Sequence, residues 1–149
     1  NSMKTKKILT LMLSLALTFV FLIPSSVYAD TDTAVPYASQ LISSYKISVN
    51  ALGNGKMEIA ASVDAKRKIE KLGFESIEVQ ELNNSSWKTV KTYKDSLLNN
   101  MIDKNCSSMD VTLKYSGTSG KTYRAIGNII AKDGSIEETR SITSYSEKV

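Results

Sequence analysis

The stretch at residues 45–64, YKISVNALGNGKMEIAASVD, decides the fold class of this chain. Apolar side chains alternate with polar ones up to Gly53, and the alternation resumes after Gly55. A side-chain period of two is typical of a half-buried β-strand, and Asn-Gly between two such runs is a strong signal for a tight hairpin. Residues 45–51 and 57–63 are therefore predicted to form an antiparallel pair of strands.

A second hairpin is predicted over residues 77–93. Apolar positions alternate again on both sides of Asn83-Asn84-Ser85-Ser86, a run of residues that favour turns. The phase of the alternation changes near Gln80, which indicates a β-bulge at that point.

The C-terminal third of the chain repeats the strand pattern. Residues 109–115 alternate up to the turn signal SGTSGK, and TYRAIGNIIA, residues 122–131, is apolar enough for a central strand. Lys132-Asp133-Gly134-Ser135 predicts a last hairpin. Its second arm, residues 136–145, is polar on both faces and is expected at a sheet edge.

Two segments depart from the strand pattern. AKRKIEKLGFE, residues 65–75, favours a turn or two of helix that Gly73 would end. KDSLLNNMIDKNCSS, residues 94–108, is expected to be a packed crossover, because its apolar residues have near-helical spacing. Those residues are Leu97, Leu98, Met101 and Ile102.

About seven short strands with closely spaced turns indicate an all-β domain over residues 41–149. An immunoglobulin-like antiparallel β-sandwich is the first prediction for its architecture, with a short helical crossover allowed, and a small barrel is the second. Residues 30–40 are polar, lack periodicity and are predicted to be a flexible lead-in.

The first 29 residues are predicted to be a secretory signal peptide preceded by an artificial extension or an upstream reading of the frame. Three lysines precede the apolar run Ile8 to Ile23, and Val27-Tyr28-Ala29 is a small-residue cleavage site. The C-terminal residues SITSYSEKV include no hydrophobic anchor, so a secreted, extracellular protein is expected, with no stable membrane span after cleavage. Of 19 basic and 15 acidic residues, three lysines precede Asp30, so the chain from Asp30 has a net charge of +1, which gives no support for nucleic-acid binding.

Two stretches resemble known domains. KYSGTSGKTYRAIGNIIAKDGSIEETRSITSY, residues 114–145, is similar to the last strands of fibronectin type III and related immunoglobulin-like domains, with Tyr123 placed like their tyrosine-corner residue. IEVQELNNSSWKTVKTY, residues 77–93, resembles their central hairpin. The whole also resembles a family of small secreted clostridial and related Gram-positive proteins whose domain has no assigned function. The resemblance implies a sandwich and supplies no catalytic residues; the chain departs from it in having no cysteine pair and in carrying Trp87 on a return strand.

Catalytic chemistry is largely excluded by composition. The chain has no histidine and one cysteine, Cys106, so histidine-dependent triads, histidine-containing metal sites and structural zinc sites cannot form within one chain. GTSGKT, residues 117–122, has too few residues between its glycines for a phosphate-binding loop, and SSWK, residues 85–88, lacks the partner motifs of penicillin-recognising enzymes. No enzyme, cofactor or metal is expected.

The candidate binding surface combines an aromatic strip with a basic cluster. We expect Trp87, Lys91 and Tyr93 to share one face of their strand, where aromatic anchors would bind an extracellular protein or glycan. Lys66, Arg67 and Lys68 could add an anion-binding surface. For Trp87 itself, core or hairpin packing is the first interpretation and a place on this surface the second. The alternative function is a secreted inhibitor or toxin-like effector that binds a protein through loops 83–86 and 117–121.

Overall fold

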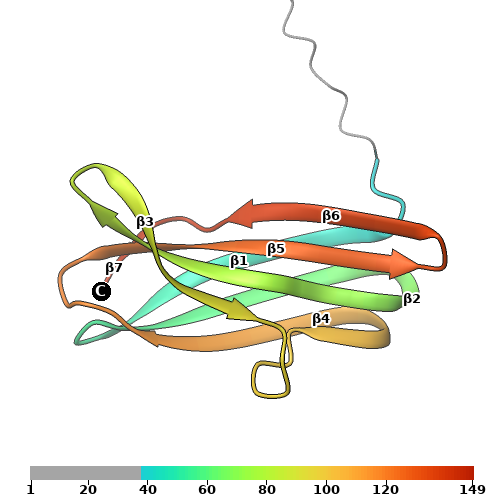
Figure 1. Cartoon of the computed structure of the whole chain (residues 1–149), viewed down its shortest axis with the longest axis horizontal. Helices are drawn as coiled ribbons and strands as arrows, with labels where there is room; N and C mark the ends of the chain where they lie inside the picture. The colour runs from blue at the N-terminus through green and yellow to red at the C-terminus, as the bar shows by residue number, and fades with distance from the viewer. Residues whose placement is uncertain (1–37) are drawn as a thin grey trace, which may run out of the picture. The chain divides into compact units, whose positions relative to one another are not determined.

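The computed structural model describes residues 38–149, and the regular structure in this part of the chain consists of β-strands. Seven strands form one antiparallel sheet that curls into a half-barrel, consistent with a β-sandwich (Figure 1). The strands are β1 (Ile42–Gly53), β2 (Lys56–Asn83), β3 (Ser86–Lys94), β4 (Ile102–Ser116), β5 (Thr122–Asp133), β6 (Ile136–Thr143) and β7 (Glu147–Lys148). The all-β prediction is confirmed. The signal peptide predicted at residues 1–29 lies outside the described residues.

Strand β2 organises the fold because it pairs with most of the others. Its first half pairs with β1 on one side and β4 on the other, and its second half pairs with β3 and β5. The chain bends between these halves, at the right of Figure 1, so that β1 packs against β5 and β6. Among the strands of residues 38–149, β6 pairs only with β5, which confirms the predicted edge position, and β5 lies between β2 and β6 as a central strand should.

The core fills the space enclosed by the bent sheet. Alternate residues of the strands point inward, and the largest fully buried side chains include Tyr123, Phe74, Met57 and Ile59. Among residues 38–149, every buried side-chain nitrogen and oxygen has a hydrogen-bond partner. The residues of this core cluster lie within residues 41–149, so a protein that begins at Asp30 retains them.

The predicted helical turn at residues 65–75 is wrong. These residues belong to β2, and the backbone of Lys71, Leu72 and Gly73 pairs with β4 on one side and β5 on the other. The three-residue spacing of Ile69 and Leu72 among charged residues suits a helix, but hydrogen bonds to two neighbouring strands override that local preference. Ile69 and Leu72 are both buried on this strand.

The predicted packed crossover at residues 94–108 is also largely wrong. Strand β4 begins at Ile102, and only residues 95–101 form the connection from β3. Met101 is fully buried, whereas Leu97 and Leu98 are fully exposed. No helix long and apolar enough to span a membrane occurs in residues 38–149.

Glu138 on β6 fixes the start of the domain. Its carboxylate accepts hydrogen bonds from Ser39 Oγ at 2.5 Å and from the backbone N–H groups of Gln40 at 2.5 Å and Leu41 at 3.3 Å. Desolvation raises the pKa of Glu138, but the donated hydrogen bonds together outweigh it, so the pKa lies below its ordinary value of 4.5. The end of the predicted lead-in is therefore tied to the sheet.

We expect Glu138→Gln to destabilise the domain by about 1 kcal/mol near neutral pH, since the amide is a weaker acceptor than the carboxylate. A lowered folded-state pKa stabilises the fold above the unfolded pKa, and this contribution is lost as the pH falls through the folded pKa. The stability difference between wild type and Glu138→Gln should therefore shrink in acid, below about pH 4. Urea unfolding at a series of pH values measures it, and a difference independent of pH would contradict the assignment.

Candidate functional site

Trp87 lies on the outward face of the sheet formed by β2, β3 and β5. Val79 on β2 is fully buried, so the next residue, Gln80, points outward, and Leu82 points outward with it. Trp87 is the cross-strand partner of Leu82, and Arg124 is the partner of Gln80. Trp87 is half-buried, which places it between the two alternatives, core or surface, that its sequence left open.

Arg124 stacks on Trp87 and is held in place by a hydrogen-bond chain. The guanidinium carbon lies 4.3 Å from the centre of the indole ring. Arg124 Nε donates to Gln80 Oε1 at 2.8 Å, Gln80 Nε2 donates to Thr89 Oγ1 at 3.2 Å, and Thr89 Oγ1 donates to Glu78 Oε2 at 3.2 Å. We call these five residues the Trp87–Arg124 patch: Glu78, Gln80, Trp87, Thr89 and Arg124.

The patch can bind anionic or hydrogen-bond-accepting groups. The Nε bond to Gln80 fixes the plane of the Arg124 guanidinium, and its two terminal nitrogens can present parallel N–H donors, the geometry that carboxylates and phosphates accept. Because Arg124 covers one face of the indole, Trp87 acts as a support for the cation as well as an apolar contact.

The predicted strip of Trp87, Lys91 and Tyr93 does not exist as a single face. The predicted bulge is confirmed: Thr89 is opposite Gln80, whereas Lys91 is opposite Val79, so Val90 is an extra residue. Adjacent residues of β2 point to opposite faces, so Thr89 and Lys91 do too. The bulge separates Trp87 from the other two residues of the prediction.

Lys91 and Tyr93 instead close the gap between β3 and β4. The Tyr93 hydroxyl donates to the backbone carbonyl of Lys114 at 2.8 Å, and Lys91 Nζ lies 5.3 Å from the centre of the Tyr93 ring. Desolvation, together with the nearby Tyr115, raises the pKa of Tyr93. Both residues serve the packing of the sheet edges, which leaves Lys91 exposed and Tyr93 half-buried.

The predicted basic cluster lies at the bend of β2, far from Trp87. Lys66 Nζ donates to the carbonyl of Ser39, and Arg67 forms an ion pair with Asp133 at 2.8 Å. Lys68 is exposed. Lys68 and Leu82, the partner of Trp87, are fourteen residues apart on β2, a path of about 45 Å at the usual rise of a strand. The two halves of the predicted surface cannot contact one small ligand.

Tyr123 fixes the loop beside the patch through its hydroxyl. Its hydroxyl accepts the backbone N–H of Thr118 at 2.8 Å and donates to Glu81 Oε2 at 2.7 Å. Desolvation and the bond to Glu81 raise the pKa of Tyr123. Gly117 lies against the Tyr123 ring, where an added Cβ would approach to 2.5 Å. Loop 117–121 is thereby anchored to β2, close to the hairpin that carries Trp87.

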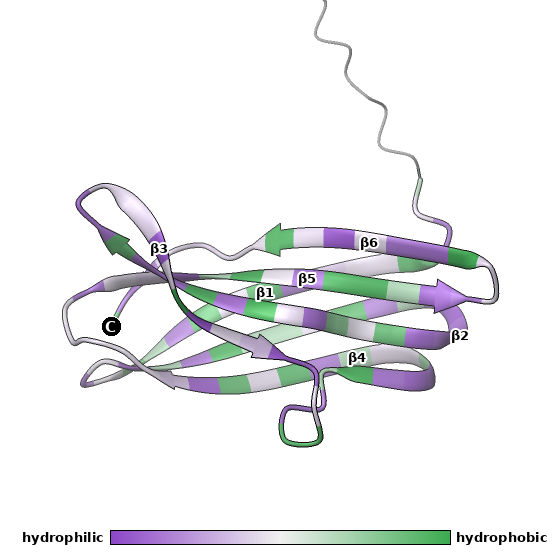
Figure 2. Ribbon diagram, in the orientation of Figure 1, coloured by the Kyte–Doolittle hydropathy of each residue, from purple (hydrophilic) through white to green (hydrophobic). Residues whose placement is uncertain are grey.

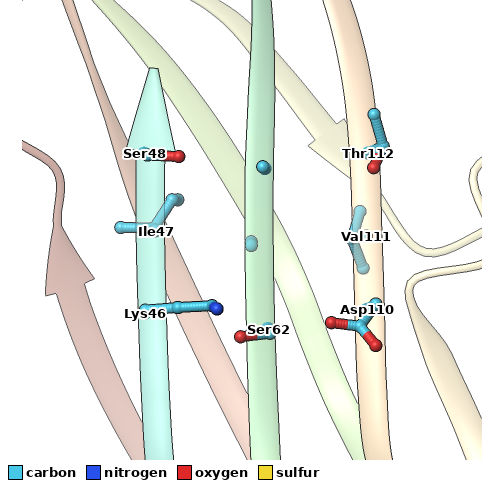
Figure 3. A pocket seen from close by; sticks show the side chains of 9 residues that line it. Lys46, Ile47, Ser48, Ser62, Asp110, Val111 and Thr112 are labelled. Carbon is cyan, nitrogen blue, oxygen red and sulfur yellow. The ribbon is translucent and has the colours of Figure 1, made fainter. Parts of the chain in front are cut away.

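A shallow groove of about 320 Å³ crosses the outward face of β1, β2 and β4. Figure 3 shows how it arises: Lys46 and Asp110 flank Ser62, their shared cross-strand partner on the central strand. In the next row Ala60 lies between Ser48 and Thr112. Small residues that alternate with core residues along residues 57–63 indicate a shallow outward face on this strand. The sequence does not indicate the groove itself, because the strands that flank it follow only from the register.

Reactive and metal-binding groups are scarce in the described residues. Residues 38–149 contain no cluster of three or more cysteine, aspartate or glutamate side chains placed to hold a metal ion. Cys106 is free and half-buried, and desolvation followed by the charge of Asp103 raises its pKa. A raised pKa favours the thiol over the nucleophilic thiolate, so Cys106 is a poor nucleophile.

Comparisons with known proteins give no family. A scan against protein-family models finds no match, and a search of the curated proteins finds none either. Among solved structures, the chain is similar to a protein from Archaeoglobus fulgidus with 9% identity and a TM-score of 0.40, over 71% of this chain and 94% of that one. At that TM-score the likeness carries no argument about function.

Proposed function

We propose that the protein is a secreted, non-catalytic recognition module that binds an extracellular protein or glycan through the Trp87–Arg124 patch. The observation that carries this proposal is the stacking of Arg124 on Trp87 at 4.3 Å together with its hydrogen bond to Gln80. A cation that is already ordered loses little conformational entropy on binding, which favours recognition over a merely solvated charge.

The chemistry of the patch selects the class of partner. Trp and Arg are enriched among the residues that carry most of the binding energy of interfaces. The terminal nitrogens of Arg124 suit a carboxylate, so the proposed partner is an acidic polysaccharide or an acidic segment of a protein. Extracellular location is supported by the signal peptide that the sequence predicts at residues 1–29, and a non-catalytic role is supported by the absence of histidine from the sequence.

We expect Trp87→Ala to weaken binding at least about tenfold and to destabilise the domain by only about 1 kcal/mol, because the side chain is half-exposed and packs on one outward face. Binding to an immobilised acidic polysaccharide and urea unfolding measure the two effects. Tyr45→Ala is the matched control, since Tyr45 is an exposed aromatic residue on β1. A loss of about 3–5 kcal/mol in stability would show instead that Trp87 is a core residue.

A second function is favoured by the position of the loops. The turn at Asn84 and Ser85 and the loop at residues 117–121 both lie at the left of Figure 1, and the Tyr123 hydroxyl connects Thr118 to Glu81, three residues before Asn84. We propose as the alternative a secreted inhibitor or effector that engages a protein through these loops. In that case Asn83→Ala and Lys121→Ala should weaken binding more than Arg124→Gln does.

A further inference from the structure

The connection between β3 and β4 is a projecting loop. Strand β3 ends at Lys94, opposite Ser76, and β4 begins at Ile102, opposite Gly73. Both ends of the loop are therefore attached to the same edge of β2, about 10 Å apart. Residues 95–101 are more than is needed to cover that distance, so the loop extends away from the sheet (Figure 1).

The base of the loop is closed by hydrogen bonds. Asp95 Oδ1 accepts the backbone N–H groups of Met101 at 2.7 Å and Ile102 at 3.0 Å. The carbonyl of Met101 accepts the N–H of Phe74 on β2 at 2.7 Å, and the Met101 side chain is fully buried. The loop is thus anchored in the core.

Backbone groups at the tip of the loop form hydrogen bonds within the loop. The N–H groups of Asn99 and Asn100 donate to the Ser96 carbonyl at 3.2 and 2.8 Å, and Asn99 Nδ2 donates to the Lys94 carbonyl at 3.1 Å. Backbone groups that are already hydrogen-bonded within the loop cost less to remove from water at the boundary of a bilayer. These internal hydrogen bonds therefore favour insertion of the tip into the interfacial layer.

Two adjacent leucines occupy this tip. Leu97 is 105% exposed and Leu98 is 96% exposed, and Figure 2 shows the end of the loop as a hydrophobic segment beneath the sheet. The other exposed leucine of the described residues, Leu52, is 56% exposed on β1. No contact within residues 38–149 buries the Leu97–Leu98 pair, although Met101, the last residue of the loop, is buried in the core.

Basic side chains surround the base of the loop. Lys91 and Lys94 precede it and Lys104 follows it, and all three are exposed. Two of the three acidic residues nearby accept backbone N–H groups: Asp95 as described, and Asp103 Oδ1 from the N–H of Lys104 at 2.7 Å. The third, Glu75, is exposed on β2 between the partners of the two loop ends.

Lys104 also begins a row of three lysines. Lys71 on β2 is the cross-strand partner of both Lys104 on β4 and Lys132 on β5. Glu137 on β6 is opposite Lys132 and compensates that end of the row, whereas Lys71 and Lys104 are directly opposite like charges that destabilise a sheet unless something compensates them. An anionic surface would provide that compensation.

We propose that the 95–101 loop binds an anionic lipid bilayer, with Leu97 and Leu98 inserted into the interfacial layer and Lys91, Lys94 and Lys104 contacting the headgroup phosphates. An apolar tip with a basic surround is the pattern of peripheral membrane attachment, in which apolar insertion and attraction to anionic lipid act together. A bilayer fits better than a protein pocket because the tip is convex and its backbone is internally hydrogen-bonded. The proposal is independent of the Trp87–Arg124 patch.

The test is co-sedimentation of residues 30–149 with vesicles of phosphatidylcholine, with and without phosphatidylglycerol. Wild type should sediment with the phosphatidylglycerol vesicles and be released by salt. The double variant Leu97→Ser, Leu98→Ser should bind at least about tenfold more weakly with unchanged thermal stability, since both side chains are fully exposed. Leu52→Ser is the matched control and should bind like wild type.

A fluorescence measurement locates the tip directly. In a Trp87→Phe background, Leu97→Trp carries the only tryptophan of the chain, and its emission should shift to the blue when phosphatidylglycerol vesicles are added. The proposal is overturned if wild type fails to sediment, if Leu52→Ser loses as much binding as the double variant, or if the emission is unchanged. It is equally overturned if the leucine pair proves to mediate self-association in size-exclusion chromatography.

Discussion

Gly73→Ala is expected to destabilise the protein by about 4 kcal/mol, because the new Cβ collides with backbone and not with a movable side chain. Gly73 has a φ of +154°, and a Cβ there would lie 2.1 Å from the Met101 carbonyl oxygen and 2.7 Å from Ile102 Cα. The collision would push the start of β4 away from β2 and break the bond from Phe74 N–H to Met101. Urea unfolding measures the loss.

Gly120→Ala is the matched control for this substitution. Gly120 has a φ of +82°, but nothing lies within 4 Å of its added Cβ. It should therefore lose only about 1 kcal/mol from backbone strain. Equal losses in the two variants would show that the close approach of β4 to Gly73 has no energetic role.

Tyr123→Phe is expected to cost about 2 kcal/mol, the second largest effect. The ring and its packing remain, but the Thr118 N–H and the Glu81 carboxylate lose their shared partner, and one of these bonds involves a charged acceptor. Loop 117–121 should loosen as well. Thermal unfolding gives the stability change, and hydrogen exchange at the Thr118 amide reports on the loop.

Tyr93→Phe is the control for the loss of a tyrosine hydroxyl. The Tyr93 hydroxyl donates to a backbone carbonyl at an exposed sheet edge, so water can replace it and the cost should stay below about 1 kcal/mol. If both variants lose the same stability, Tyr123 has no special role in joining the loop to β2.

The sequence predicted the strands well because alternation and turn residues are local signals. The hairpins at Gly53-Asn54-Gly55 and Asp133-Gly134, and the bulge at Val79 and Gln80, are all where the pattern indicates. It failed at residues 65–75, because the continuity of β2 depends on hydrogen bonds to β4 and β5, which are distant in sequence. The prediction of a packed crossover failed around Ser96 to Asn100 for another reason. Helical spacing of apolar residues does not show whether the rest of the protein offers a surface that buries them.

The candidate site was predicted only in part. Trp87 was identified, but its partner Arg124 was missed, because their proximity depends on two cross-strand registers that meet at β2. The sequence predicts a bulge near Gln80 but not which strand carries the extra residue, and that residue moves Lys91 and Tyr93 to the other face. Lys66, Arg67 and Lys68 were grouped with the site by charge alone.

The central claim is recognition through the Trp87–Arg124 patch, and Arg124→Gln tests it most directly. Labelled protein of residues 30–149 would be titrated onto purified cell wall, mucin and extracellular matrix, with acidic and neutral sugars as competitors. The account predicts saturable binding to at least one of these, competed by the acidic ligand and weakened at least about tenfold by Arg124→Gln. Absence of binding to all of them, or equal binding by wild type and Arg124→Gln, would contradict it.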